Sequence, residues 1–478
     1  MPISHVTGYL HYIMGECAPN LSGAVADYIP ELAEVDPDRY ALSVCMHDGN
    51  TYSLGDVDTE FTIQSVSKPL TYAMVLSRRD MTEVDAKIGV EPSGEAFNEI
   101  SVDKQGRPRN PMINAGAILA SSMLLPPKRE LPGGIVDEVF AEIVEFYSQC
   151  AGRRLTMDTE VWLSESRTGS RNRSIVYMLD SFGAIDTDPE AALDLYFRQC
   201  SLRVTSDDLA VVAATIAAGG VNPRTGRRVL SNEVAQRLLS VMTTCGMYDG
   251  AGDWVTTVGL PAKSGVGGGI LAVLPGQLGI GVYSPRLDSH GNSVRGVATC
   301  RRLSRDLGLH MFNVTRESRV TIRSIYSIAE FEVGDHWTEL ERSYLRTCRE
   351  RVHVYELQGD LTFAGAERAL RRIEYDLDEL DVAVIEISRV GIIDPVARMM
   401  LLSVKHTTDA RGQRAMLVDP DGVIRESVAS HRSDYVVPDL NVPEQLQGFD
   451  PALPNVYSTM EAAVGDAEKF QLERYRRT

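Results

Sequence analysis

The period of the hydrophobic pattern changes once along this 478-residue chain, and that change limits the folds open to it. In the first part, strand-like runs lie at both ends of a helical stretch that covers residues 85 to 245. After residue 351, short strands and helices alternate. The two patterns need two different packing arrangements. We therefore predict an α+β domain over residues 1–312, a charged and less regular connector over 313–350, and a small α/β domain over 351–465.

Two pairs of short runs in the first part are typical of β-hairpins. Ala41–His47 and Thr51–Leu54 flank one Gly-containing turn, and Gly269–Leu274 and Leu278–Ser284 flank another. Because the helical stretch separates the two hairpins, one sheet must be built from distant segments. The sequence thus predicts an antiparallel sheet beside a helical region.

Charge and cysteine use exclude several classes of partner. The net charge is −18 and no basic block is present, so we expect neither nucleic acid nor a membrane surface as a partner. Seven scattered cysteines lack Cys-x-x-Cys spacing, and nine histidines form no metal-binding pattern. We expect no disulfide framework, no metal and no cofactor.

Without a signal peptide or an apolar run of about 20 residues, the expected location is the cytoplasm.

Two short motifs carry the candidate chemistry. Ser65-x-x-Lys68 begins a helical run, where residues three apart share a face and the ammonium can reach the hydroxyl. Lys263-Ser264-Gly265 stands just before the second hairpin. A lysine acts as a base only if burial or a second cation lowers its pKa. A Ser-x-x-Lys helix opposite a Lys-Ser-Gly strand is the arrangement of serine β-lactamases and penicillin-binding proteins. The N–H groups of Ser65 and Val266 are the matching candidates for an oxyanion hole.

Longer strings in the same order indicate the family that the first domain resembles. The strings are Glu91–Gly94, Arg109–Ala117, Ser164–Arg173, Leu195–Ser201, Thr244–Asp249 and Gly259–Val266. Together they closely resemble the serine-dependent glutaminases of bacteria and animal mitochondria, over roughly residues 10–312. The resemblance implies a β-lactamase-like fold and the hydrolysis of L-glutamine to L-glutamate and ammonia through an acyl-enzyme.

The resemblance also implies a role for each matching position. Ser65 is then the nucleophile and Lys68 the group that takes its proton, while Lys263 helps to keep Lys68 neutral. Tyr248 or Tyr196 relays a proton to the departing ammonia. The implied catalytic residues are Ser65, Lys68, Tyr248 and Lys263, and the implied substrate contacts are Ser65, Asn114, Glu165, Asn172, Tyr196, Tyr248 and Val266. Glu165 is the natural carboxylate for the α-ammonium of glutamine.

Three of these residues also fit ordinary structural roles. Tyr196 fits a core aromatic, Glu165 a charge at a helix end, and Asn114 a helix cap. The alternative functions are a Ser-x-x-Lys hydrolase of β-lactams or peptides and a catalytically inactive scaffold. A carboxylate at Glu165 argues against the first, because it would repel the carboxylate of a β-lactam. The intact serine and both lysines argue against the second, since a scaffold has no physical need of them.

The last part of the chain resembles a STAS domain over about residues 351–465, through Val352–Phe363, Val384–Asp394 and Gly412–Val418. STAS domains bind proteins or nucleotides, so the resemblance implies a protein or anion effector; a generic small α/β domain is the alternative. In the anti-sigma-factor antagonists, the matching helix opens with Asp-Ser-Ser-Gly and is phosphorylated. The stretch Asp394–Ala397 has no hydroxyl, which predicts regulation by fixed contacts. The glutaminase resemblance further implies a homo-oligomer.

Overall fold

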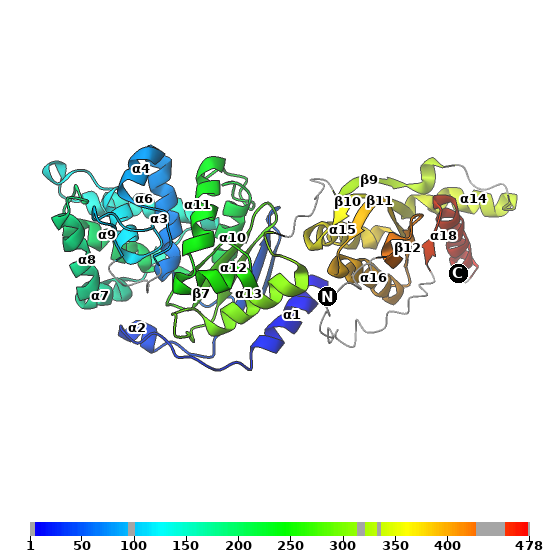
Figure 1. Ribbon diagram of the computed structural model, residues 1–478. Helices are drawn as coiled ribbons and strands as arrows, with labels where there is room; N and C mark the ends of the chain where they lie inside the picture. The colour runs from blue at the N-terminus through cyan, green and yellow to red at the C-terminus, as the bar shows by residue number, and fades with distance from the viewer. Residues whose placement is uncertain (1–4, 94–100, 313–320, 332–335, 427–454, 477–478) are drawn as a thin grey trace. The chain divides into compact units, whose positions relative to one another are not determined.

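The structure, a computed structural model, describes residues 5–93, 101–312, 321–331, 336–426 and 455–476. The chain divides into two compact units, one of residues 7–313 and one of residues 314–478 together with residues 1–6. Residues 7–313 are coloured from blue to green and residues 314–478 from yellow-green to red in Figure 1. Each unit is built around its own five-stranded sheet. The predicted fold class, an α+β unit followed by a smaller α/β unit, is confirmed.

The larger sheet of the first unit is antiparallel, with the order β2-β1-β8-β7-β6. Its strands are β1 (Ala41–Met46), β2 (Thr51–Gly55), β6 (Ala262–Ser264), β7 (Gly269–Leu274) and β8 (Leu278–Tyr283). Both predicted hairpins are present, as β1–β2 and β7–β8. The pairing of β1 with β8 joins the two ends of the region into one sheet.

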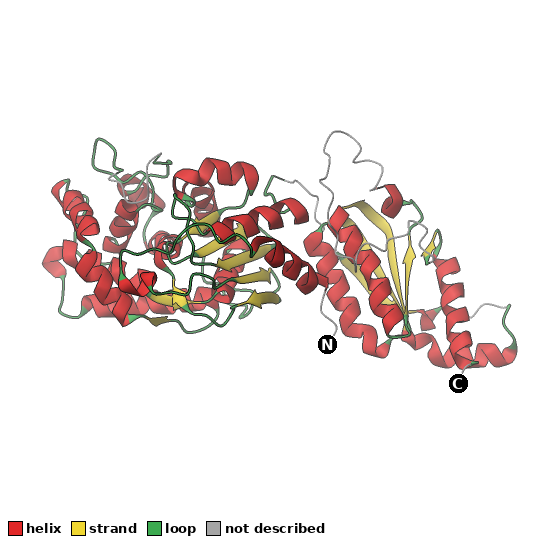
Figure 2. Cartoon of the chain, turned by 90° about the horizontal axis from the view of Figure 1, so that it is seen from below, coloured by secondary structure: helices red, strands yellow, loops and turns green. Residues whose placement is uncertain are grey.

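Helices cover both faces of this sheet (Figure 2). α10 (Ser206–Ala217) lies on one face, where a Cβ at Gly279 or Gly281 of β8 would overlap its backbone atoms. The absence of these two side chains therefore allows the helix to approach the strand closely. α13 (Val294–Leu307) packs on the other face, where Gly296 lies against Ile270 of β7.

The helical region stands beside the sheet and is connected to it through a small second sheet of order β3-β5-β4. The small strands are β3 (Phe61–Thr62), β4 (Thr156–Met157) and β5 (Leu202–Val204). The helices are α3 (Ser67–Arg78), α4 (Met81–Lys87), α5 (Asn114–Ser122), α6 (Ile135–Ala151), α7 (Thr159–Thr168), α8 (Ser170–Ser181), α9 (Pro189–Cys200), α11 (Asn232–Cys245) and α12 (Ala251–Thr257), with α1 (His5–Cys17) and α2 (Pro30–Ala33) before the sheet. The short helices η1 (Gln64–Val66) and η3 (Tyr248–Gly250) precede α3 and α12.

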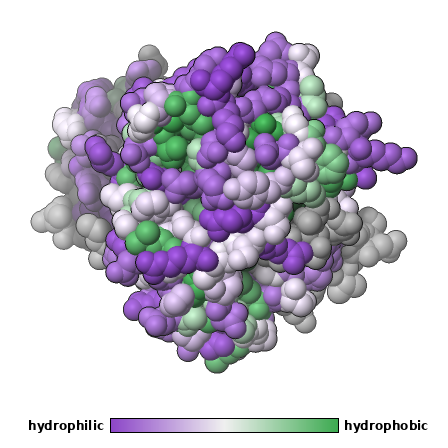
Figure 3. All heavy atoms as spheres, turned by 90° about the vertical axis from the view of Figure 1, so that its left-hand side faces the viewer, coloured by the Kyte–Doolittle hydropathy of each residue, from purple (hydrophilic) through white to green (hydrophobic). Residues whose placement is uncertain are grey.

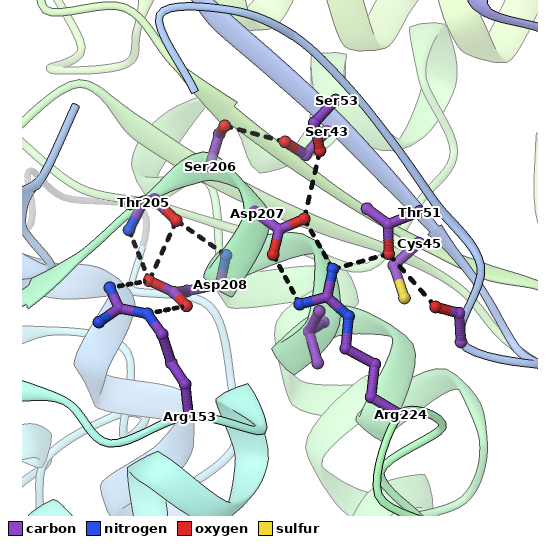
Figure 4. Close-up of polar contacts among 12 residues, drawn as sticks. Ser43, Cys45, Thr51, Ser53, Arg153, Thr205, Ser206, Asp207, Asp208 and Arg224 are labelled. Atoms are coloured by element: carbon purple, nitrogen blue, oxygen red, sulfur yellow. Dashed lines mark hydrogen bonds and ion pairs between the residues drawn. The ribbon is translucent and has the colours of Figure 1, made fainter. Parts of the chain in front are cut away.

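A polar network ties the start of α10 to the rest of the first unit (Figure 4). Thr205 and Asp208 form a capping box at this helix start. The Asp208 side chain, only 2% exposed, also accepts two hydrogen bonds from Arg153, at 2.6 and 2.5 Å. The neighbouring Asp207, which is more exposed, accepts two from Arg224, at 2.7 and 2.8 Å. Arg153 follows α6, so this network holds the helical region against the sheet.

The second unit is a mixed sheet with the order β13-β12-β11-β10-β9. Its elements are β9 (Ile322–Ser327), α14 (Glu339–Cys348), β10 (Val352–Leu361), α15 (Phe363–Asp376), β11 (Val382–Ile393), α16 (Pro395–Ala410), β12 (Arg414–Val418), α17 (Val423–Glu426), β13 (Val456–Tyr457) and α18 (Met460–Tyr475). β10 to β13 are parallel, as expected for strand–helix alternation. Ala463 and Ala467 of α18 pack on the sheet face formed by Val352, Val354 and Val384.

The stretch expected as a connector, residues 313–350, contains regular structure. β9 pairs antiparallel with β10 at the sheet edge, and α14 begins with a capping box at Thr338 and Glu341. The residues of β9 are only partly buried, so their sequence lacks the apolar run of a buried strand. Residues 427–454, within the range expected for the second domain, lie outside the described residues.

One face of the molecule is mainly polar. The face shown in Figure 3 is mainly hydrophilic, with apolar side chains in small, separate patches. This agrees with the net charge of −18. None of the helices in the described ranges combines the length and the apolar character needed to cross a bilayer.

We expect Asp208→Ala to lower the free energy of unfolding of the first unit by about 2 kcal/mol, because it removes one of the two bonds of the capping box and the buried partner of Arg153. Urea denaturation followed by circular dichroism measures the loss. The control is Asp207→Ala, which removes a carboxylate that is itself 28% exposed and should cost less than about 1 kcal/mol. Equal losses for the two variants would contradict this assignment.

Candidate active site

Ser65 lies at a sharp change of direction between the small sheet and α3. It is the middle residue of η1, which follows β3 and runs straight into α3. Gln64 has a φ of 48°, a left-handed conformation that costs a residue with a side chain about 1 kcal/mol or more. The Ser67 hydroxyl donates to the Gln64 carbonyl oxygen at 2.7 Å. This bond stabilises the turn that presents Ser65 at the start of the helix.

Two lysine side chains converge on this turn, and both are buried. Lys68, on α3, donates to Asn114 Oδ1 at 2.6 Å, and burial lowers its pKa from 10.5 to about 8. Lys263, on β6, donates to the Ser264 carbonyl oxygen at 2.6 Å. Burial, and then the charge of Lys68, lower the pKa of Lys263 well below its ordinary value. Both lysines therefore have neutral forms within reach near physiological pH.

Tyr248 lies between Lys263 and Ser65. Its hydroxyl donates to the Ser264 carbonyl oxygen at 2.9 Å, and the Lys263 ammonium lies 4.0 Å from its ring centre. Burial raises the pKa of Tyr248, while a hydrogen bond with Ser65 works in the opposite direction. Its φ is 56°, so this residue also adopts a left-handed backbone. A phenol that stays protonated beside a serine can serve as a proton donor.

The turn between β6 and β7 brings the Val266 backbone toward Ser65. A Cβ on Gly267 would lie 2.8 Å from the Thr62 carbonyl oxygen, so glycine is needed for the turn to come this close. Within the described residues, the N–H groups of Ser65 and Val266 have no hydrogen-bond acceptor. Two unused N–H donors beside a nucleophile are what an oxyanion hole requires.

Asn114, Asn172 and Tyr196 meet beside Lys68, each from a different helix. Asn114, the first residue of α5, donates from Nδ2 to Asn172 Oδ1 on α8 at 2.8 Å. Tyr196 of α9 donates to Asn114 Oδ1 at 3.3 Å, the oxygen that Lys68 also binds. Burial raises the pKa of Tyr196. The three residues predicted from the sequence therefore form one cluster, and the Asn114 side chain makes these contacts instead of capping α5.

Glu165 is buried near the end of α7, with 5% of its surface exposed. Its Oε1 accepts a hydrogen bond from the Tyr28 hydroxyl at 2.9 Å. Burial raises the pKa of Glu165, and hydrogen bonds from Tyr28 and Gln64 oppose that rise. Among the described residues, no lysine or arginine pairs with this carboxylate. A buried carboxylate without a protein cation is suited to bind a cationic ligand.

Sequence reasoning missed Tyr28 and Gln64. Tyr28 lies in an irregular segment before α2, with no periodic pattern, and 137 residues separate it from Glu165 in the chain. Only the folded chain shows that its hydroxyl reaches the carboxylate. Gln64 gave one usable signal, which is its position directly before the candidate nucleophile.

A cavity of about 320 Å³ lies beside the Val266 turn. It is lined by Ala24, Val25, Asp249, Val266, Leu287, Asp288, Ser289, His290 and Gly291. Asp249 follows Tyr248 and is bonded to His290 Nδ1 at 3.0 Å. The cavity therefore borders the oxyanion turn at Val266 and the residue that follows Tyr248. In the ranges that the structure describes, no group of three or more His, Cys, Asp or Glu side chains is placed to hold a metal ion.

The fold and the site define an α+β hydrolase with a Ser-x-x-Lys helix facing a Lys-Ser-Gly strand. The glutaminase family model matches residues 23–312, and the STAS domain model matches residues 345–437. The chain belongs to the glutaminase family and carries a STAS domain after the catalytic unit.

Individual relatives resemble the chain over most of its length. It is 41% identical to the glutaminase of Corynebacterium glutamicum over 432 residues, which cover 90% of this chain and 97% of that protein. It is 44% identical to glutaminase 1 of Bradyrhizobium diazoefficiens over 365 residues, 76% of this chain and 58% of that protein. The crystal structure of Mglu aligns with a TM-score of 0.63 at 40% identity, over 87% of this chain and 99% of that one.

We expect Gly267→Ala to lower kcat by about 10²–10³-fold, because the new Cβ would push the Val266 N–H away from Ser65 and remove one oxyanion donor. Steady-state ammonia release measures the change, and thermal melting checks that the variant folds. Gly252→Ala is the control, since a Cβ there meets no atom within 4 Å. A kcat for Gly267→Ala within about threefold of the control would show that the turn has no role in the rate.

Proposed function

We propose that this chain hydrolyses L-glutamine to L-glutamate and ammonia, with Ser65 as the nucleophile. The observation that carries the proposal is the burial of two lysines, both with lowered pKa, beside one serine. Relatives over most of the chain are named glutaminase, and Mglu has also been solved in a glutamate form. These relationships support glutamine as the substrate.

In the acylation step, neutral Lys68 takes the proton of the Ser65 hydroxyl as its oxygen attacks the side-chain amide carbon. The N–H groups of Ser65 and Val266 stabilise the negative charge that develops on the amide oxygen. When the carbon–nitrogen bond breaks, Tyr248 gives its proton to the departing ammonia. The ammonium of Lys68 then reprotonates Tyr248 and becomes neutral again. A γ-glutamyl ester on Ser65 is the product of this step.

Deacylation reverses these roles with water in the place of ammonia. Water attacks the ester carbon and gives up a proton, and the Ser65 oxygen leaves and regains one. By microscopic reversibility, the groups that protonated the leaving ammonia are the groups that deprotonate the water. Lys68 and Tyr248 therefore serve both half-reactions without any further acid or base.

Recognition of the substrate follows from the charges around the site. The buried carboxylate of Glu165 binds the α-ammonium, and the amide groups of Asn114 and Asn172 bind the α-carboxylate. A β-lactam or a peptide substrate offers a carboxylate or a neutral amide where Glu165 stands. Burial next to Glu165 would make both costly. We therefore favour a free amino acid over these alternatives.

We further propose a homo-oligomer in the cytoplasm whose STAS unit binds a protein or anion effector. All seven cysteines are buried and free, which suits a reducing compartment. Asp394 stands at the N-cap position of α16 with Pro395 after it, and the neighbouring Ile392 is 59% exposed. Ile392 belongs to the end of β11, just before α16, and we propose this end of the strand as the place where a partner makes fixed contacts.

Substrate choice tests the proposed function directly. We expect ammonia release from L-glutamine to exceed that from L-asparagine by about 10²-fold or more, because the shorter side chain does not bring its amide to Ser65. Hydrolysis of a chromogenic β-lactam should not be detectable. Ser65→Ala should abolish turnover and still bind glutamine in calorimetry. Efficient β-lactam hydrolysis, or turnover by Ser65→Ala within about tenfold of wild type, would refute the proposal.

The lysine base predicts a rate that depends on pH. Since the pKa of Lys68 is lowered to about 8, its neutral fraction, and with it kcat/KM, should rise as the pH passes through that value. Lys68→Met should reduce kcat by about 10³-fold or more and remove the rise. Lys87→Met, at a surface lysine paired with Asp186, is the control and should leave the profile unchanged. A flat wild-type profile from about pH 6 to 9, with chemistry rate-limiting, would contradict the lysine-base mechanism.

A further inference from the structure

One carboxylate near the substrate site is left without a role by the proposed reaction. Glu31 lies on α2, three residues after Tyr28. Its Oε1 accepts a hydrogen bond from the Ser164 hydroxyl at 2.8 Å. Its other oxygen, Oε2, is buried and receives no hydrogen bond from any residue that the structure describes. A buried acceptor without a donor is rare in folded proteins and points to a missing partner.

The position of Glu31 is fixed beside Glu165. Ser164, which binds Glu31, is the neighbour of Glu165 on α7, and Tyr28 binds Glu165 from the same segment as Glu31. The negative charge of Glu31 adds to the rise in the Glu165 pKa that burial causes. Ile29 and Leu32, on either side of Glu31, belong to one buried apolar cluster with Val161 and Val266. The Glu31 carboxylate therefore belongs to a well-packed segment and lies near the Glu165 carboxylate.

We propose that Glu31 is a second carboxylate of the ammonium-recognition site and sets the selectivity of the enzyme for ligands with a free α-amino group. This rests on the proposed function, in which Glu165 binds the α-ammonium. An ammonium group carries three N–H donors, and one Glu165 oxygen is already used by Tyr28. The unpartnered oxygen of Glu31 is a further acceptor for the same group.

Charge explains why two carboxylates are useful here. In the empty site, Glu31 and Glu165 repel each other, and a bound ammonium between them removes that repulsion. A ligand without the ammonium gains nothing from either group. Both carboxylates together therefore favour an amino acid over its deaminated analogue more strongly than one carboxylate does.

Ligand binding by calorimetry separates charge from simple packing. The two probes are L-glutamate and glutarate, which has the same carbon chain and both carboxylates but no amino group. Glu31→Gln keeps the acceptor for Ser164 and removes the charge. We expect it to weaken glutamate binding about three- to tenfold and to leave glutarate binding unchanged or tighter. Ser164→Ala keeps the charge and removes the hydrogen bond, and it should change the glutamate-to-glutarate preference by less than about twofold.

Several outcomes would overturn the proposal. Equal effects of Glu31→Gln on both ligands, or no effect on either, would leave Glu31 as a structural residue. An equal loss of preference in Ser164→Ala would assign the effect to the hydrogen bond between α2 and α7. Glu31→Asp, which keeps the charge, must retain the preference if thermal melting shows that Glu31→Gln is unstable. Glu165→Gln is measured in the same assay. If this variant keeps the full preference for glutamate over glutarate, the proposed role of Glu165 is wrong. If the preference is lost in Glu165→Gln and kept in Glu31→Gln, only the role of Glu31 is refuted.

Discussion

The burial of two lysine ammonium groups beside one serine is the constraint on which the rest of the catalytic unit depends. A charged ammonium loses its hydration when it is buried, so each lysine is pushed toward its neutral form and needs an acceptor for its remaining N–H groups. Lys68 donates a hydrogen bond to Asn114 Oδ1, and Lys263 donates one to the Ser264 carbonyl oxygen. The scaffold behind them is equally fixed, because Tyr147 donates to the Ser67 carbonyl oxygen at 2.7 Å on the buried side of α3. The lowered pKa of both lysines is thus a product of packing.

Strain in the backbone is found at the same place. Of the residues described, Gln64 and Tyr248 are the two non-glycine residues with positive φ, and they stand directly before and against Ser65. Such conformations persist only where the surrounding contacts hold them. The Ser67 bond to the Gln64 carbonyl and the Tyr248 bond to the Ser264 carbonyl supply that support. Strain on both sides of one serine is in keeping with a preorganised nucleophile.

The sequence predicted the features that depend on local pattern. The hairpins β1–β2 and β7–β8 follow from strand-like runs around glycine turns, and Ser65, Lys68 and Lys263 were found from two short motifs. Features that depend on tertiary contacts could not be predicted from the sequence. β9 was not predicted because an edge strand is half exposed and lacks a buried apolar run. Tyr28 and Glu31 were not predicted because the segment that contains them shows no hydrophobic period. The lowered pKa of each lysine depends on burial, which only the folded chain defines.

The titration of the two buried lysines is the sharpest test of a lysine base in this site. In protein labelled with [ε-¹³C]lysine, the signals missing from the spectra of Lys68→Met and Lys263→Met identify the two side chains. We predict that Lys68 titrates near pH 8 and that Lys263 titrates well below 10.5. If both signals titrated near 10.5, neither lysine could serve as the base, which would contradict the proposed mechanism.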